Sequence, residues 1–212
     1  MTSTSKLLPA GRQDFAKDPF GYSALGPMKW EHACMVAGVN NHSSALSPSD
    51  ILKNPILWLT QAQAMSDAAF AVLSTEQSFQ NMPAPVRGIC ESQYCAIVLM
   101  LVGYSLEISL KAMLIVQKGI TGYTEIENKI RHHRLEDLAS FIPELTKKDK
   151  AILRGLTHFV SWAGRYPDPG SGREDNIEQI FDLGEKHQVT GHDLFKLAAH
   201  IMQHTKNVVE QN

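Results

Sequence analysis

The sequence has 212 residues, of which 43% are hydrophobic and 20% are charged. These values are typical of a soluble globular protein, and the length allows one good core with an appendage rather than two full domains. The formal net charge of −2 excludes a general electrostatic attraction to nucleic acid, so any such contact depends on a local basic patch.

The cysteines and the start of the chain indicate the compartment. Three cysteines without CxxC spacing, and no charged and then apolar leader, predict a cytoplasmic protein. The most apolar run, CAIVLMLVGY from Cys95 to Tyr104, is too short to span a bilayer, and Glu107 and Lys111 interrupt its continuation. We therefore expect a buried helix in this region and no membrane span.

Residues 1–46 mix Gly, Pro, Ser and Asn with scattered aromatic side chains and show no sustained hydrophobic period. We expect an irregular N-terminal arm here. A solvated tail seldom carries so many aromatic residues, which predicts that the arm lies over the body of the protein or over a partner. Residues 47–212 are expected to form a helical body.

Capping residues and prolines mark the first helices of this body. In SPSD, Ser47 and Asp50 form a capping box that opens a helix, and Pro55 restarts it. This helix is predicted to run to about Ser74. The longest helix follows a proline-marked loop and covers about 91–118.

Further signals of the same kind divide the rest of the chain. Gly119 is predicted to end the longest helix as a C-terminal glycine. A short helix in HHRLEDLASF is predicted to end at Pro143. A capping box at Thr146 and Asp149 opens the next helix, which ends at Gly164. A capping box at Thr190 and Asp193 opens the last helix, which runs to about Val208.

The pattern of these elements predicts the fold class. No alternating β-branched run bounded by hairpin turns is present, so a sheet has little support. Four long helices and one short helix with modest connections predict an all-α protein, an antiparallel four- to five-helix bundle. Its one long connection is expected at 165–190.

Glu107 is the first candidate functional residue, because it falls among apolar neighbours on one face of the longest helix. A carboxylate in such a place needs a cation or hydrogen-bond donors. Lys111, one turn further on, predicts an ordinary i,i+4 pair. The functional alternative is that Glu107 orients Arg165, whose planar fork binds carboxylate or phosphate through two hydrogen bonds.

Four segments resemble the HEPN family (higher eukaryotes and prokaryotes nucleotide-binding), over about residues 50–208 and in the family's order. They are YCAIVLMLVGYSLEISLKAMLIVQKG with its Glu-x-x-Leu-Lys-Ala core at Glu107, HHRLEDLASF with a His-x-Leu-x-x-Leu pattern, LTHFVSWAGRYPDP with Arg-Tyr-Pro at 165–167, and HDLFKLAAHIMQHTKNVV. The resemblance implies an antiparallel helical bundle that often dimerises. It also implies a role in toxin–antitoxin or defence modules, sometimes beside a nucleotidyltransferase.

Catalytic members of this family are ribonucleases with an Arg followed four to six residues later by a His, used across a dimer interface. Arg165 has no His in that window, its next one being His187, and Arg154 and His158 are one residue too close. His158 and Arg165 are seven residues apart, close to two helical turns, so both would face one cleft if the helix persists. A structural histidine is the other interpretation of His158.

The leading hypothesis is a HEPN-like nucleotide- or RNA-binding module of a toxin–antitoxin or defence system that lacks the usual ribonuclease motif. Glu107 and Lys111 position Arg165, which contacts phosphate. Tyr166 lends an aromatic face, and the basic segment KIRHHR, with Arg131 and Arg134, adds phosphate contacts.

The other function classes stay open at this point. One is a divergent metal-independent endoribonuclease that uses His158 and Arg165, and another is a structural or interaction protein without a ligand. No cofactor is expected, and no metal, because His200 and His204 have the spacing of helical ligands but no further ligand beside them. The expected partners are a second copy of the chain in a homodimer, and an antitoxin or nucleotidyltransferase.

Overall fold

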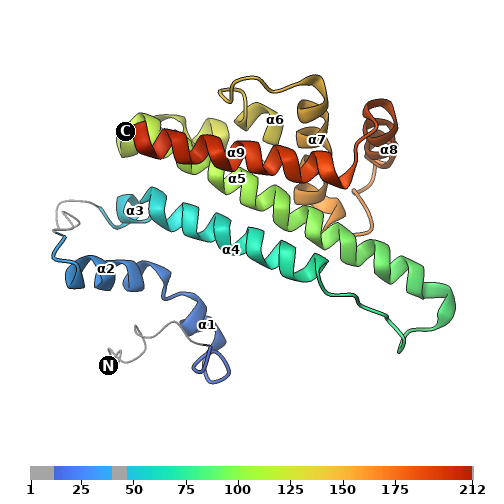
Figure 1. Ribbon diagram of the computed structural model, residues 1–212, viewed down its shortest axis with the longest axis horizontal. Coiled ribbons are helices and arrows are strands. Elements are labelled where there is room, and N and C mark those ends of the chain that lie inside the picture. Colours follow the sequence, from blue (N-terminus) through green and yellow to red (C-terminus); the bar gives the residue numbers. More distant parts are fainter. Residues whose placement is uncertain (1–11, 40–46, 212) are drawn as a thin grey trace. The chain divides into compact units, whose positions relative to one another are not determined.

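The computed structural model describes residues 12–39 and 47–211, and within these ranges it contains helices and no strand (Figure 1). The all-α prediction is confirmed. The chain divides after Leu57 into two compact units rather than after residue 46. The elements are α1 (Pro19–Ser23), α2 (Gly26–Val36), α3 (Pro48–Ile51), α4 (Pro55–Leu73), α5 (Ala84–Ile130), α6 (Leu135–Leu138), α7 (Lys147–His158), the π-helix η3 (Phe159–Ala163), α8 (Asp175–His187) and α9 (Gly191–Gln211).

The N-terminal unit corrects the expectation of an irregular arm, because residues 19–36 form the helices α1 and α2. Prolines stand in the first turn of both helices, and the Asp18 side chain caps α1 by accepting a hydrogen bond from the backbone N–H of Gly21 at 2.9 Å. Cys34 is the one buried residue of α2, so no apolar stripe signals this helix in the sequence. The predictions for 1–11 and 40–46 lie outside the described residues.

The long helix α5 starts earlier and extends further than predicted. Gly119 interrupts it as expected, with φ 68° and ψ 173°, a conformation that favours glycine. The helix then resumes and continues to Ile130, where the sequence predicted an end at Gly119. The buried ring of Tyr123 explains the continuation, because it packs with Leu114 and Ile115 in a small second cluster of the core.

Within the described part of the chain, α5 is also the one helix that is long and apolar enough to cross a membrane by length and composition. It passes this test although the apolar run Cys95 to Tyr104 alone is short. The core helix of a soluble protein gives the same result, and 61% of the most apolar window of α5 is buried inside the protein. The helix is therefore weak evidence for a membrane span.

The core of the second unit forms around α5, which packs against α6, α7, η3 and α9. Leu106, Leu110 and Met113 of α5 are almost completely buried there, together with Leu197 and Ile201 of α9. Two side chains of α5 also bind backbone carbonyls of α4. The hydroxyl of Ser105 donates to Ala62 O at 2.8 Å, and that of Tyr94 donates to Val72 O at 3.2 Å.

The helix α7 begins at the predicted capping box. The Asp149 N–H donates to Thr146 Oγ1 at 3.1 Å, and the Thr146 N–H donates to Asp149 Oδ2 at 2.9 Å. After His158 the helix widens into η3, and Gly164 follows with a right-handed φ of −84°. Gly164 is thus not a left-handed helix stop. It allows close approach, because a Cβ at this position would overlap the side chain of Met100 on α5.

The segment 165–190, predicted as one long connection, contains the helix α8. Gly170 and Gly172 lie before it with positive φ, and Gln188 ends it in the left-handed region. The last predicted capping box is confirmed, since Thr190 N–H donates to Asp193 Oδ2 at 3.0 Å and Asp193 N–H donates to Thr190 Oγ1 at 3.2 Å. It opens α9, which runs alongside α5 (Figure 1).

Candidate functional site

An open groove of about 860 Å³ lies between α6, α7 and α8. Its volume lies within the range of about 300–1,000 Å³ that small-molecule sites occupy. The lining residues are mostly polar or charged: Arg134, Glu136, Asp137, Arg154, Thr157, His158, Gln179, Asp182, Leu183, Glu185, Lys186 and His187. This groove is the candidate functional site.

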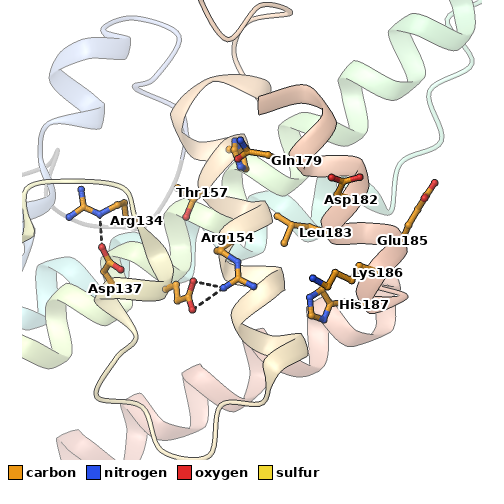
Figure 2. A pocket seen from close by; sticks show the side chains of 12 residues that line it. Arg134, Asp137, Arg154, Thr157, Gln179, Asp182, Leu183, Glu185, Lys186 and His187 are labelled. Carbon is orange, nitrogen blue, oxygen red and sulfur yellow. Dashed lines mark hydrogen bonds and ion pairs between the residues drawn. The ribbon is translucent and has the colours of Figure 1, made fainter. Parts of the chain in front are cut away.

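Cationic groups enter the groove from two facing helices. Arg154 of α7 points towards α6, where its Nη1 donates to both carboxylate oxygens of Glu136 at 3.1 and 2.9 Å. Figure 2 shows Lys186 and His187, from the last turn of α8, pointing back towards α7, with Leu183 above them. A cation in the last turn of a helix is favoured by the helix dipole.

Carboxylates outnumber the fixed cations in the lining, with Glu136, Asp137, Asp182 and Glu185 against Arg134, Arg154 and Lys186. Arg134 binds Asp137 through its Nε, and Arg154 binds Glu136. Because both pairs are substantially exposed, each contributes at most about 1 kcal/mol, and a ligand phosphate can replace the carboxylate. Glu185 also lines the groove, but its side chain points away from α7 in Figure 2. The basic side of the groove is therefore the space between Arg154 and the end of α8.

His158 lies in the groove wall as a neutral side chain. Burial lowers its pKa below the ordinary value of 6.5. The indole Nε1 of Trp162 donates to His158 Nδ1 at 3.5 Å, which leaves the proton of the neutral ring on Nε2. In this state the ring offers a hydrogen-bond donor at Nε2 rather than a base.

Glu107 belongs to a separate, buried cluster. Its side chain is 7% exposed, and its two oxygens accept from different partners: Oε1 from Lys111 Nζ at 2.7 Å, and Oε2 from His133 Nδ1 at 2.8 Å. Lys111 also donates to the backbone carbonyl of His132 at 3.3 Å. The predicted i,i+4 pair of Glu107 and Lys111 is confirmed, and His133 joins it to make a cluster of three.

This cluster fixes the basic turn Arg131–Arg134. Lys111 binds the turn through the His132 carbonyl, while Glu107 holds the ring of His133. Arg131 and Arg134 are exposed on the same turn, and Arg134 reaches the groove. The positioning role expected for Glu107 and Lys111 thus applies to this turn.

The predicted contact between Glu107 and Arg165 is wrong. Both carboxylate oxygens of Glu107 bind other residues, and Arg165 is an exposed side chain in the turn after η3 that donates to the carbonyl of Ser161. The Arg165 guanidinium lies over the ring of the exposed Tyr166, 5.5 Å from its centroid. Neither residue lines the groove, so the structure does not bring Arg165 together with His158 there.

Of the predicted site residues, the groove therefore contains Arg134 and His158. Arg131, Arg165 and Tyr166 lie on the exposed surface, and Glu107 and Lys111 are buried beneath the basic turn. Sequence reasoning placed Arg154 with the basic run 129–134 as a candidate phosphate-binding face, and it missed Lys186 and His187. The apolar period of 175–187, with Lys and His in its last turn, is the signal that would have revealed α8.

No group of three or more His, Cys, Asp or Glu side chains in the described ranges is arranged to hold a metal ion. His204 instead packs its ring against Phe141, with the ring centroids 6.5 Å apart. No known protein family, curated protein or solved structure matches this chain.

Proposed function

We propose that this chain is a HEPN-like antiparallel helical bundle that binds a nucleotide or RNA through phosphate contacts in the groove. The observation that carries the proposal is the pair of cations on its basic side, Arg154 from α7 and Lys186 from α8, with the ring of His187 beside Lys186. Arginine and lysine are the side chains that bind phosphate through charge-assisted hydrogen bonds. The order of the four sequence segments is the support for the family.

The basic turn extends this site along the surface. Arg131 and Arg134 stand where a longer ligand that leaves the groove passes next, and the buried pair Glu107 and Lys111 holds their turn in place. A pre-positioned cation loses less conformational entropy on binding than a free side chain does. Arg165 and Tyr166 offer a separate phosphate and stacking contact on the exposed end of the α7–η3 helix.

In the biological setting of the proposal, the homodimer, the toxin–antitoxin or defence system and the partner follow the resemblance, and the cytoplasmic location follows the free cysteines. The protein acts in the cytoplasm, as a homodimer, in a toxin–antitoxin or defence system, beside an antitoxin or a nucleotidyltransferase. It needs no metal or cofactor to bind its ligand and does not enter a membrane.

Fluorescence anisotropy with a labelled single-stranded RNA, and competition by AMP, test the binding. The variant Arg154→Ala/Lys186→Ala is expected to bind at least about tenfold more weakly, because hydrogen bonds to charged groups contribute about 1.5–3 kcal/mol each. The matched control is Lys150→Ala/Lys196→Ala, which removes the same charge from exposed positions outside the groove. Equal weakening by both variants, or no binding by the wild type, contradicts the proposal.

A divergent metal-independent ribonuclease is the second candidate, and the position of His158 beside Arg154 in the groove favours it. Incubation of the RNA with the protein in EDTA separates the two functions. Cleavage that His158→Ala and Arg154→Ala both abolish replaces the binding module with the enzyme. Absence of both binding and cleavage leaves the structural or interaction protein.

A further inference from the structure

A second hollow, of about 340 Å³, lies where α4, α5 and α9 meet, and it shares no residue with the groove. It exists because the side chains at this level are small: Ala62 of α4, Ser109 of α5 and Thr205 of α9. All three are buried, with 2%, 2% and 7% of their surface exposed. Helices that meet through such small side chains leave space that neighbouring residues do not fill.

The walls of this hollow are mainly apolar. Leu59, Met202 and Val209 are the larger apolar side chains that line it. The charged side chains stand at the exposed rim, where Lys206 and Glu210 form an ion pair with 3.8 Å between Nζ and Oε1. An apolar wall with few polar groups is the usual composition of a small-molecule site.

The polar group in the floor is Ser109. No hydrogen bond of its hydroxyl to a described residue is found, whereas the other two buried Ser and Thr hydroxyls of the described residues are paired. Ser105 donates to Ala62 O at 2.8 Å, and Thr205 donates to Ile201 O at 2.9 Å. A hydroxyl without a protein partner in such a place pairs with water or with a ligand. Because Ser109 keeps a small accessible area and lines the hollow, its hydroxyl faces the hollow.

We propose that this hollow binds a small, neutral, mainly apolar molecule through one hydrogen bond between its polar head and Ser109. The ligand is neutral because no charged side chain lies in the floor, and the charges at the rim already pair with each other. It has about the size of one substituted ring, and its polar head is a hydroxyl or carbonyl group. This site does not depend on the function proposed for the groove.

Titration calorimetry with p-cresol and p-xylene tests the site, because the two probes have nearly the same shape and differ in one hydroxyl group. Both are expected to bind the full chain. In Ser109→Ala, the affinity for p-cresol falls about fivefold through loss of one neutral hydrogen bond, and the affinity for p-xylene stays unchanged. Ser105→Ala is the matched control: it removes a buried serine hydroxyl one turn earlier, outside the hollow, and leaves both affinities unchanged.

The filling variant Ser109→Leu is expected to abolish binding of both probes, with its cooperative unfolding checked by circular dichroism. If Ser109→Leu does not fold, Ala62→Val serves as the filling variant in its place. Binding of either probe to a folded filling variant with wild-type affinity overturns the proposal. No binding to the wild type overturns it as well, and so does an unchanged affinity of Ser109→Ala for p-cresol, which would mean that the hydroxyl faces only water.

Discussion

The two helices that face each other across the groove differ in how they are anchored. Four residues of α7 are buried in the core: Ala151, Ile152, Leu153 and Leu156. The neighbouring α8 packs against α7 and has no buried residue (Figure 1). The groove therefore has one wall that the core fixes and one wall that packs mainly against α7. Regions with few buried apolar contacts open at low free energy, so we expect α8 to be the less stable wall.

The largest expected effect compares one leucine from each wall. Leu153 is completely buried, and Leu153→Ala is expected to lower the free energy of unfolding by about 4 kcal/mol, through lost burial and the cavity left behind. Leu183 on α8 is half-buried, and Leu183→Ala is expected to cost less than about 2 kcal/mol. Urea unfolding followed by circular dichroism measures both. Equal losses would remove the distinction between the walls.

A substitution of Glu107 tests whether its cluster stabilises the turn before α6, on the side of the groove that the core fixes. Glu107→Gln leaves Lys111, whose side chain is 12% exposed, without its carboxylate, and is expected to lower the free energy of unfolding by about 3 kcal/mol. Glu125→Gln on the same helix is the control, with an expected change within about 0.5 kcal/mol because the side chain is exposed. The same urea titration measures both variants, and a cost for Glu107→Gln no greater than that of the control would show that the cluster holds nothing in place.

Replacing glycine by alanine is expected to change the stability in opposite directions at Gly103, in the core, and at Gly184, on α8. A Cβ on Gly103 would overlap Val160, where α5 meets η3, so Gly103→Ala is expected to destabilise the protein by about 1–3 kcal/mol. A Cβ on Gly184 of α8 meets no atom within 4 Å. Gly184→Ala is expected to stabilise the protein by about 0.5–1 kcal/mol through helix propensity. Thermal unfolding of both variants checks the signs, and a destabilising Gly184→Ala would mean that α8 is packed as tightly as the core.

The smallest effect is the pH dependence of the contact between α7 and the start of α9. Hydrogen bonds from Thr190 and then from Lys148 lower the pKa of Asp193 to about 2 from 3.8. Because this pKa is depressed in the folded state, the contribution of Asp193 is present above its unfolded pKa and lost as the pH falls through about 4 to 2. The difference in unfolding free energy between wild type and Asp193→Asn should shrink over that range. A constant difference contradicts the assignment.

The sequence predicted well those parts of the fold that depend on neighbouring residues. The capping boxes at Thr146 and Thr190 and the break at Gly119 follow from contacts within a few residues, and all are present. The helix α8 was missed because glycines surround it and its apolar face covers only one neighbour. The widened turn η3 depends on close packing against α5, which no local pattern signals.

Less of the candidate site could be predicted. The pair Glu107 and Lys111 follows from helical spacing, but the third member, His133, lies 26 residues from Glu107 and meets it only through the tertiary fold. Arg165 was assigned to Glu107 because a buried carboxylate needs a cation, and the sequence contains no information on which cation is nearer. Lys186 and His187 join Arg154 only because α8 folds back onto α7.

Amide chemical-shift mapping with a single-stranded RNA hexamer tests most directly the claim that the groove binds phosphate. The account predicts that the largest shifts fall on Arg154, Lys186 and His187, with smaller ones along Arg131–Arg134, and that Ser109 in the second hollow stays unperturbed. No shifts at saturating RNA, or the largest shifts at Arg165 and Tyr166 with none in the groove, would contradict it.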